Sequence, residues 1–183
     1  MPPKRSAGRR KNSKPTGSGV RYSPPALVRL VKQSFRGPAW HGPSVTAALR
    51  GLDAEAANWR PAPGRPNAWE ILLHLAYSRH VMLQRLTGER SHRFERPLKK
   101  QWWPAPPMER SETSLRQDRQ LLQSYQTRLL DVVSRLTSRE LSVSRRGRHH
   151  SLAEEVVGIA MHDAYHSGQI RLLRVLRANA VPG

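Results

Sequence analysis

Four long segments of the chain carry apolar side chains at intervals of three and four residues, the repeat of a helix that buries one face. They span residues 26–35, 69–86, 111–136 and 151–178. No run of alternating apolar and polar residues, the pattern of a half-buried strand, accompanies them. One connection between them is long, and the others are short or contain shorter helical patterns. The sequence therefore predicts an all-α protein built as a four-helix bundle.

Polar residues mark where these helices begin and end. Asn67 lies three residues before Glu70, and Ser151 lies three residues before Glu154. Both pairs have the spacing of a capping box, in which two side chains satisfy the free N–H groups of the first helical turn. Gly88 has the residue type that most often ends a helix. Between the first two long helices, shorter helical patterns begin near residues 44 and 53.

The connection at residues 89–110 is too rich in proline to be helical and is longer than most loops in compact domains. It is therefore either functional or crosses over the domain, between the second and third long helices. Trp102 and Trp103 lie within it. An indole in a loop needs apolar surface to bury against, so we expect this pair to cover a pocket mouth or to pack the crossover.

Positive charge is dense at the N-terminus. The formal net charge is +19, of which seven charges lie in residues 1–22 and leave +12 on residues 23–183. Residues 1–22 offer almost nothing to bury, so we expect a disordered basic tail followed by one domain at residues 23–183. Such a field attracts nucleic acid, acidic lipid or anionic small molecules, although a general richness in arginine of the host's proteins would explain it equally well.

The absence of cysteine excludes disulfides, thiolate metal sites and cysteine nucleophiles. Any metal ion would be held by His, Asp or Glu. The basic N-terminal residues are not followed by an apolar segment, and the sequence contains no run of roughly 18 apolar residues. We therefore expect a cytoplasmic protein without a secretory signal or a membrane span.

His162 and His166 are four residues apart, so both imidazoles leave the same face of the last helix. That face also carries Ile159 and Ile170, which places the histidines on the stripe that points into the core. Buried polar groups need partners, and a shared metal ion would satisfy both rings at once. The alternative is a pair of ordinary histidines with hydrogen bonds in a hydrated part of the core.

A third ligand should come from a facing helix, because bundles build metal sites that way. His74 is the natural candidate, since it lies on the side of its helix that carries Ile71 and Leu75. Three imidazoles leave at least one coordination position open, as in catalytic zinc sites. The following histidines are expected on the surface or away from this centre: His80, His92, His149 and His150.

Three residues are weak catalytic candidates. His41, where two helical segments meet, could serve as a fourth ligand, a proton carrier or a helix cap. Tyr165 is turned about 100° from His166, which favours packing over a role as hydroxyl donor. Asp163 could orient a ligand imidazole, but a solvated carboxylate is the more common case. Gly168 costs about 1 kcal/mol in a helix interior, which predicts a close approach of another helix there.

Four stretches of the sequence match a known pattern when they are taken together. They are residues 39–44 with Trp40 and His41, residues 69–74 that end in His74, the Trp103-Pro104 pair, and residues 162–170. In this combination the chain resembles the DinB/YfiT-like superfamily of metal-dependent proteins, over roughly residues 23–180. The last stretch, with its H-x-x-x-H spacing, is the most specific of the four.

The resemblance implies a four-helix bundle with up-down-down-up topology, in which the long connection crosses between helices 2 and 3. It also implies a divalent metal ion, zinc or nickel, held by His74, His162 and His166. Several relatives act as thiol-dependent transferases or maleylpyruvate-type isomerases, and many are homodimers. The basic tail at residues 1–22 departs from the family pattern, which offers no role for it.

These observations leave three functional hypotheses. The first is a metal-dependent enzyme acting on a small molecule, as a hydrolase or as a transferase that uses a low-molecular-weight thiol. The second is a nucleic-acid-associated protein that holds phosphates without reading sequence, through residues 1–22 and the basic stretch at residues 145–148. The third is a bundle whose metal site is structural or sensory.

Overall fold

The computed structural model describes residues 22–144 and 149–180, and it confirms that the chain is predominantly helical. Helices account for nearly all of the regular structure in these ranges. The elements in chain order are α1 (Pro24–Phe35), α2 (Val45–Leu49), α3 (Ala54–Asn58), α4 (Ala68–Thr87), β1 (Leu98–Lys100), β2 (Trp103–Pro104), α5 (Glu112–Arg135), α6 (Ser138–Leu141) and α7 (Leu152–Ala180).

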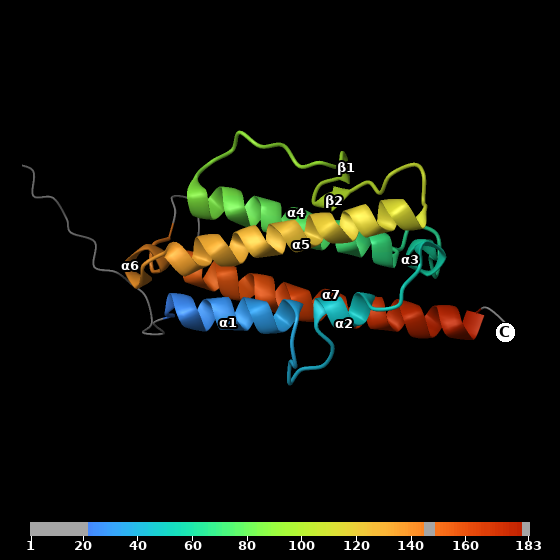
Figure 1. Ribbon diagram of the computed structural model, residues 1–183, viewed down its shortest axis with the longest axis horizontal. Helices are drawn as coiled ribbons and strands as arrows, with labels where there is room; N and C mark the ends of the chain where they lie inside the picture. Colours follow the sequence, from blue (N-terminus) through green and yellow to red (C-terminus); the bar gives the residue numbers. More distant parts are fainter. Residues whose placement is uncertain (1–21, 145–148, 181–183) are drawn as a thin grey trace, which may run out of the picture.

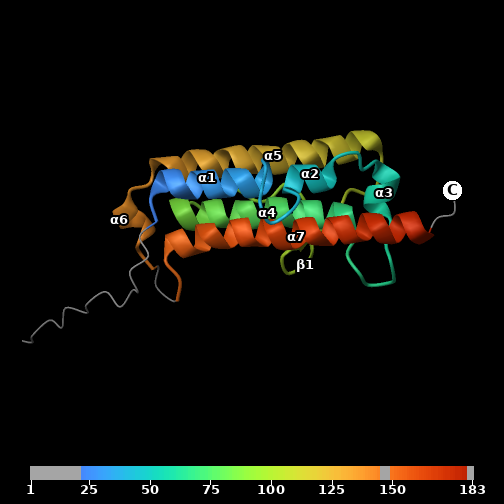
Figure 2. The ribbon, with the colours of Figure 1, turned by 90° about the horizontal axis from the view of Figure 1, so that it is seen from below.

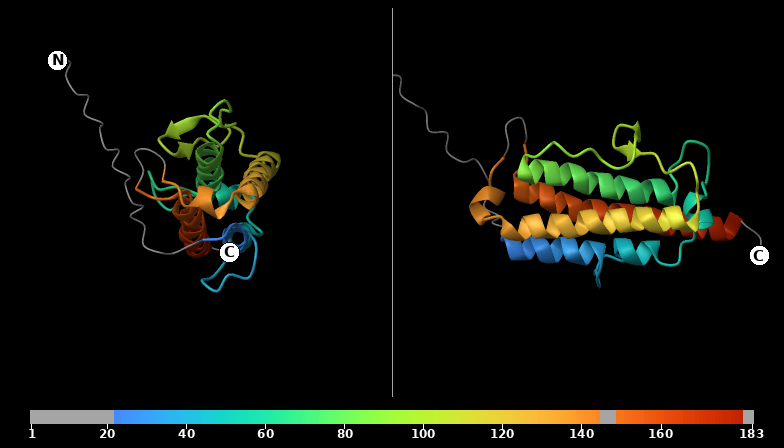
Figure 3. Two further views of the ribbon diagram at one scale, coloured as in Figure 1. Left: turned by 90° about the vertical axis from the view of Figure 1, so that its left-hand side faces the viewer. Right: turned by 45° about the horizontal axis from the view of Figure 1, so that its top comes forward.

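The longest helices, α1, α4, α5 and α7, lie side by side along the long axis of the molecule (Figure 1). α4 packs against α5 and α7, and α1 packs against the same two helices from the opposite side (Figure 3). α2 continues along α7 beyond the end of α1 (Figure 2). The apolar faces of these helices meet in one core, at whose centre Leu72, Leu129 and Val156 are fully buried.

The predicted helix starts are confirmed in atomic detail. The side chain of Asn67 accepts a hydrogen bond from the backbone N–H of Glu70 at 2.8 Å, and the Glu70 carboxylate accepts one from the N–H of Asn67 at 3.2 Å. Ser151 and Glu154 make the same exchange at the start of α7. Gly88 ends α4 with a φ of 81°, in the left-handed region where glycine avoids steric strain.

The connection between α4 and α5 contains strands, which the sequence did not predict. β1 and β2 pair antiparallel, with Leu98 opposite Pro104 and Lys100 opposite Trp103. Strands of three and two residues are too short to show an alternating pattern. The hairpin packs against α4, so the predicted crossover segment lies on the outside of the helix that carries His74.

Two boundaries near the C-terminus differ from the prediction. The short helix α6 lies between residues 136 and 151, where no helix was predicted, and Thr137 caps it through Glu140. α7 continues through Asn179 to Ala180, two residues past the predicted end, because asparagine does not by itself break a helix. Pro182, a residue type that cannot continue a helix, lies outside the described residues.

The predicted basic tail lies outside the described residues except for Tyr22, which packs against the core. The basic stretch at residues 145–148 also lies outside them. Within the described ranges, no helix is both long enough and apolar enough to cross a membrane.

Candidate metal centre

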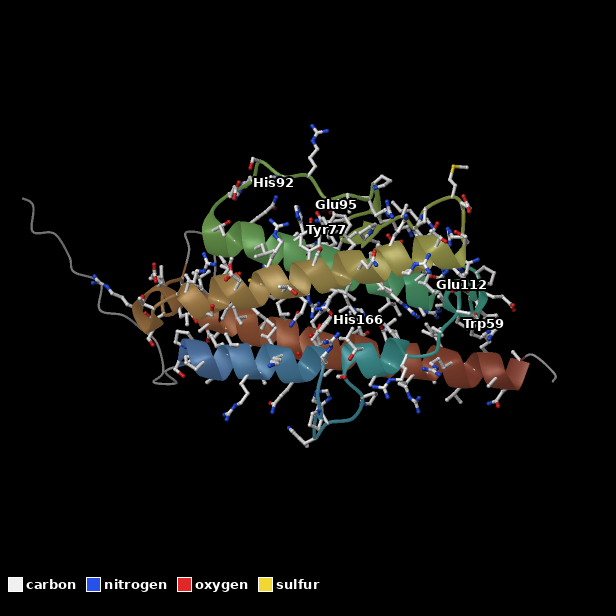
Figure 4. All side chains as sticks on the ribbon, viewed as in Figure 1. Trp59, Tyr77, His92, Glu95, Glu112 and His166 are labelled. Atoms are coloured by element: carbon white, nitrogen blue, oxygen red, sulfur yellow. The ribbon has the colours of Figure 1, made fainter. Side chains whose placement is uncertain are left out.

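Three histidines converge where α4 packs against α7. His74 comes from the first half of α4, and His162 and His166 lie one turn apart on α7. Nε2 of His162 lies 2.9 Å from Nε2 of His74 and 3.0 Å from Nε2 of His166. One ring nitrogen from each residue lies within 4.8 Å of the other two. His166 lies among the long helices near the middle of the molecule (Figure 4).

The hairpin fixes the ring of His74. Nδ1 of His74 lies 2.6 Å from the backbone oxygen of Trp102, and the ring stacks on Trp103 with centroids 4.4 Å apart and planes inclined by 13°. Trp102 has a φ of 70°, a left-handed conformation that costs a non-glycine residue about 1–2 kcal/mol. Trp103 thus packs the crossover against the histidines, as the sequence predicted, and strained backbone brings the Trp102 carbonyl to His74.

A side chain on α7 fixes the ring of His166. Nδ1 of His166 lies 2.6 Å from Oε1 of Gln169, and Nε2 of Gln169 donates to the Tyr165 hydroxyl at 3.0 Å. A carbonyl or amide oxygen only accepts hydrogen bonds, so Nδ1 carries the proton in both His74 and His166. The two Nε2 atoms are therefore unprotonated and expose a lone pair.

The chemistry of these nitrogens fits a cation. Nε2 of His162 lies within 3.0 Å of both lone pairs but can donate a proton to only one of them. At least one of these two close contacts therefore lacks a hydrogen bond unless a positive ion lies between the rings. Nδ1 of His162 is buried and has no hydrogen-bond partner within the described part of the chain. Three imidazole nitrogens are a ligand set that zinc and nickel accept.

Burial keeps these imidazoles neutral. Desolvation, with smaller contributions from His166, His74 and Arg79, lowers the pKa of His162 to about 3. Desolvation, with a contribution from His74, lowers the pKa of His166 to about 4. Desolvation also lowers the pKa of His74, although its hydrogen bond to Trp102 opposes the shift. Neutral imidazole is the form that binds metal, so the lone pairs are available at ordinary pH.

A cavity of about 520 Å³ opens beside His74 and His162. α4 and α7 form most of its wall, and Trp102 and His150 complete it. Besides the two histidines, the lining residues on these helices are Ser78, Val81, Met82, Arg85, Glu154, Glu155, Gly158, Ile159 and Met161. A second cavity of about 590 Å³ lies around Trp59 and Glu112, and its lining contains no histidine (Figure 4). The first cavity therefore offers a small molecule a way to His74 and His162.

Asp163 is fully buried, so the prediction of a solvated carboxylate is wrong. Nη2 of Arg79 donates to its two oxygens at 2.7 and 2.8 Å, and the Ser34 hydroxyl donates to it at 2.8 Å. Nε of Arg79 donates to Gln126 at 2.7 Å. One polar network therefore ties α1, α4, α5 and α7 together. Burial raises the pKa of Asp163, and its contacts with Arg79 and Ser34 oppose that shift.

Arg79 is the residue near the centre that sequence reasoning missed. It lies one turn beyond Leu75, on a stretch of α4 in which neighbouring side chains are buried. An arginine on the apolar face of a helix signals a buried acidic partner, because an unpaired charge there is costly. That signal was present in the sequence, but it does not identify Asp163 as the partner.

The other candidates lie outside the cluster of three histidines. His41 is exposed in the connection between α1 and α2. Tyr165 is 63% exposed, and its ring lies 4.9 Å from that of His166. A Cβ atom at Gly168 would meet no other atom within 4 Å, so the predicted close helix approach is wrong. That glycine faces open space on the exposed side of α7.

His80 is buried but points away from the centre, as predicted. Its Nδ1 lies 3.2 Å from the Tyr125 hydroxyl, which donates to Glu95 at 2.8 Å. Tyr77 stacks near it on the side of α4 that faces the connection, and Glu95 belongs to the connection itself (Figure 4). His92 is exposed in that connection. This second cluster attaches the connection to α4 and α5.

Comparison with known protein families gives one match. The family model described as DinB superfamily matches residues 40–170, which include all three histidines. Neither the curated proteins nor the solved structures gave a match to this chain.

Proposed function

The chain belongs to the DinB superfamily, and we propose that it is an enzyme whose metal site is formed by His74, His162 and His166. The observation that carries this proposal is that the unprotonated Nε2 atoms of His74 and His166 both converge on Nε2 of His162. This arrangement is unfavourable without a cation. Zinc or nickel suits the ligand set. Three protein ligands leave a position open, as in catalytic zinc sites.

We propose hydrolysis, or group transfer to a low-molecular-weight thiol, as the reaction. When bound, the ion would supply Lewis acidity and lower the pKa of a bound water to about 7. The backbone oxygen of Trp102 and the amide of Gln169 hold two ligand rings in one tautomer. The chain contains no cysteine, so a reacting thiol would have to be a co-substrate.

We also propose the up-down-down-up topology for the long helices. In support, α4 and α5 both run from the end of the molecule near α3 toward α6 in Figure 1, whereas α1 and α7 run the opposite way. The connection between α4 and α5 returns along α4 (Figure 3). This arrangement places His74 and His162 on adjacent helices at the same depth.

Metal analysis of protein purified without a histidine tag tests the proposal. We expect close to one divalent ion per chain, lost in His162→Ala and kept in His80→Ala, which removes a buried histidine outside the cluster. Circular dichroism would verify that both variants fold. A wild-type chain that is free of metal and unchanged by added zinc or nickel would refute the proposal.

Non-specific association with nucleic acid is the second candidate, and the formal charge of +19 favours it. It does not compete for the same residues, because the tail and the histidine cluster are separate in the sequence. A structural or sensory metal site is the third candidate. It predicts a bound ion that no small ligand approaches, which differs from the open position proposed above.

A further inference from the structure

The walls of the cavity beside His74 and His162 are mainly apolar. Val81 and Met82 of α4 and Ile159 and Met161 of α7 line it, and Trp102 adds an indole. Its volume of about 520 Å³ lies within the usual range for sites that bind small organic molecules. A ligand that enters would place its body among these side chains and one end against the histidines.

The charged groups around this cavity already have protein partners. Nη1 of Arg85 lies 3.5 Å from Glu155, and its guanidinium lies 5.7 Å from the centre of the Trp102 ring. Glu154 accepts hydrogen bonds from the backbone and hydroxyl of Ser151 at the helix start. Arg85 and Glu155 thus compensate one another, and the Glu154 carboxylate is occupied by neutral donors of the helix start. Among the described residues that line the cavity, no charge is therefore left without a partner for a strongly charged ligand, which disfavours selection for one.

Gly158 leaves open space at the wall of the cavity. A Cβ atom there would meet no other atom within 4 Å, although the residue lines the cavity. Glycine in a helix interior costs about 1 kcal/mol relative to alanine, so its helical propensity does not account for its presence. Gly168 has the same open surroundings on the same helix but does not line the cavity. The two glycines form a matched pair for experiment.

We propose that this cavity is the substrate site and that it takes a small neutral molecule with an alkyl or aryl body and one polar reacting group. The polar group faces His74 and His162, and the body lies against Met82, Met161 and the open face of Gly158. The orientation of the ligand rests on the proposed metal function, whereas the apolar cavity itself does not. Gly158 is then a residue that determines specificity by leaving space.

Two binding measurements on the full chain test this proposal. In the metal-free protein, fluorescence of the neutral dye N-phenyl-1-naphthylamine should rise on binding to the wild type and to Gly168→Leu. The dye should bind Gly158→Leu at least tenfold more weakly, because a leucine side chain would occupy the cavity. Equal binding to all three proteins would overturn the proposal.

In the cobalt-substituted protein, the visible spectrum should report hydroxamate binding. Benzohydroxamate should bind the wild type at least tenfold more tightly than acetohydroxamate, since a phenyl ring buries more apolar surface than a methyl group. Gly158→Leu should lose this preference while still binding cobalt, and Gly168→Leu should keep it. Equal affinities in the wild type would overturn the proposed ligand class. If cobalt does not bind while the dye results hold, the metal function and the ligand orientation both fail, but the apolar cavity stands.

Discussion

Arg79 and Asp163 form an ion pair in which both side chains are 0% exposed, with Nη2 of the arginine 2.7 Å from the carboxylate. Asp163 follows His162 directly on α7, and Arg79 lies five residues beyond His74 on α4. The pair therefore joins the two helices that supply the histidines, at the depth where the rings meet. It holds the helices together without occupying the proposed ligand nitrogens.

Removing one partner of this pair should destabilise the protein strongly. Arg79→Met leaves the Asp163 carboxylate buried without its cation, and we expect a loss of about 3–5 kcal/mol in the free energy of unfolding. Arg135→Met, at an exposed ion pair with Asp131, should cost less than about 1 kcal/mol. Urea denaturation measures both. Similar losses in the two variants would contradict this account.

The metal-free protein should lose stability as the pH falls below 6.5. The pKa values of His162 and His166 are about 3 and about 4 in the folded chain, against the ordinary histidine value of 6.5. Between these values the unfolded chain binds more protons, so the free energy of unfolding falls as pH decreases. Urea denaturation in the presence of a chelator, at pH 7.5 and at pH 5.5, measures this loss of stability. His162→Gln should show a smaller loss than the wild type, whereas exposed His92→Gln should not.

The Trp102→Gly variant should be more stable than the Trp102→Ala variant. Both substitutions remove the indole, but only glycine accepts a φ of 70° without steric strain. We expect Trp102→Gly to exceed Trp102→Ala by about 1 kcal/mol in the free energy of unfolding. At neighbouring Gln101, whose φ is not positive, alanine should be the more stable of the two. Equal stability of the two Trp102 variants would show that the turn relaxes.

Removal of residues 1–22 should weaken binding to plain duplex DNA at low salt. The segment contains seven basic residues and no acid, so its contribution comes from the release of counterions. Binding should also depend less on salt: the negative slope of log affinity against log salt concentration should become smaller in magnitude, by at most about six. A full-length chain that shows no binding before truncation would end the nucleic-acid hypothesis.

The chain should self-associate through α7. Leu172, Val175 and Leu176 are 58%, 52% and 40% exposed near the end of this helix, and large exposed apolar side chains that gather on one element often mark an interface. Sedimentation equilibrium should find a homodimer that Leu172→Glu combined with Val175→Glu converts to a monomer. Leu30→Glu, on α1, should leave the dimer intact. A monomeric wild type would contradict the prediction.

Local interactions made much of the fold predictable. The capping pairs of Asn67 with Glu70 and of Ser151 with Glu154 depend on residues three apart, so their spacing in sequence is their spacing in space. The apolar repeat likewise assigns His74 to the buried side of its helix, and His162 and His166 to one face of theirs. Neither argument requires knowledge of any distant residue.

Three features could not be read in this way, because they join residues far apart in the chain. The carbonyl that holds His74 comes from Trp102, in a hairpin whose strands are too short to leave a sequence pattern. The partner of Asp163 is on α4, so its burial was missed. Gly168 lies in a helix interior, as a glycine at a close helix contact does, yet α7 presents it to open space.

The sequence by itself therefore determined the long helices, their capped starts and the shared face of His162 and His166, since these follow from spacing within a turn or two of one helix. It suggested His74 as the third histidine only through the buried side of a second helix. Only the tertiary structure decided which nitrogen of His74 and His166 is free, which charges are paired and which glycine borders the cavity. Those properties depend on how helices are placed against one another. That placement results from the packing of all apolar faces together and not from any single segment.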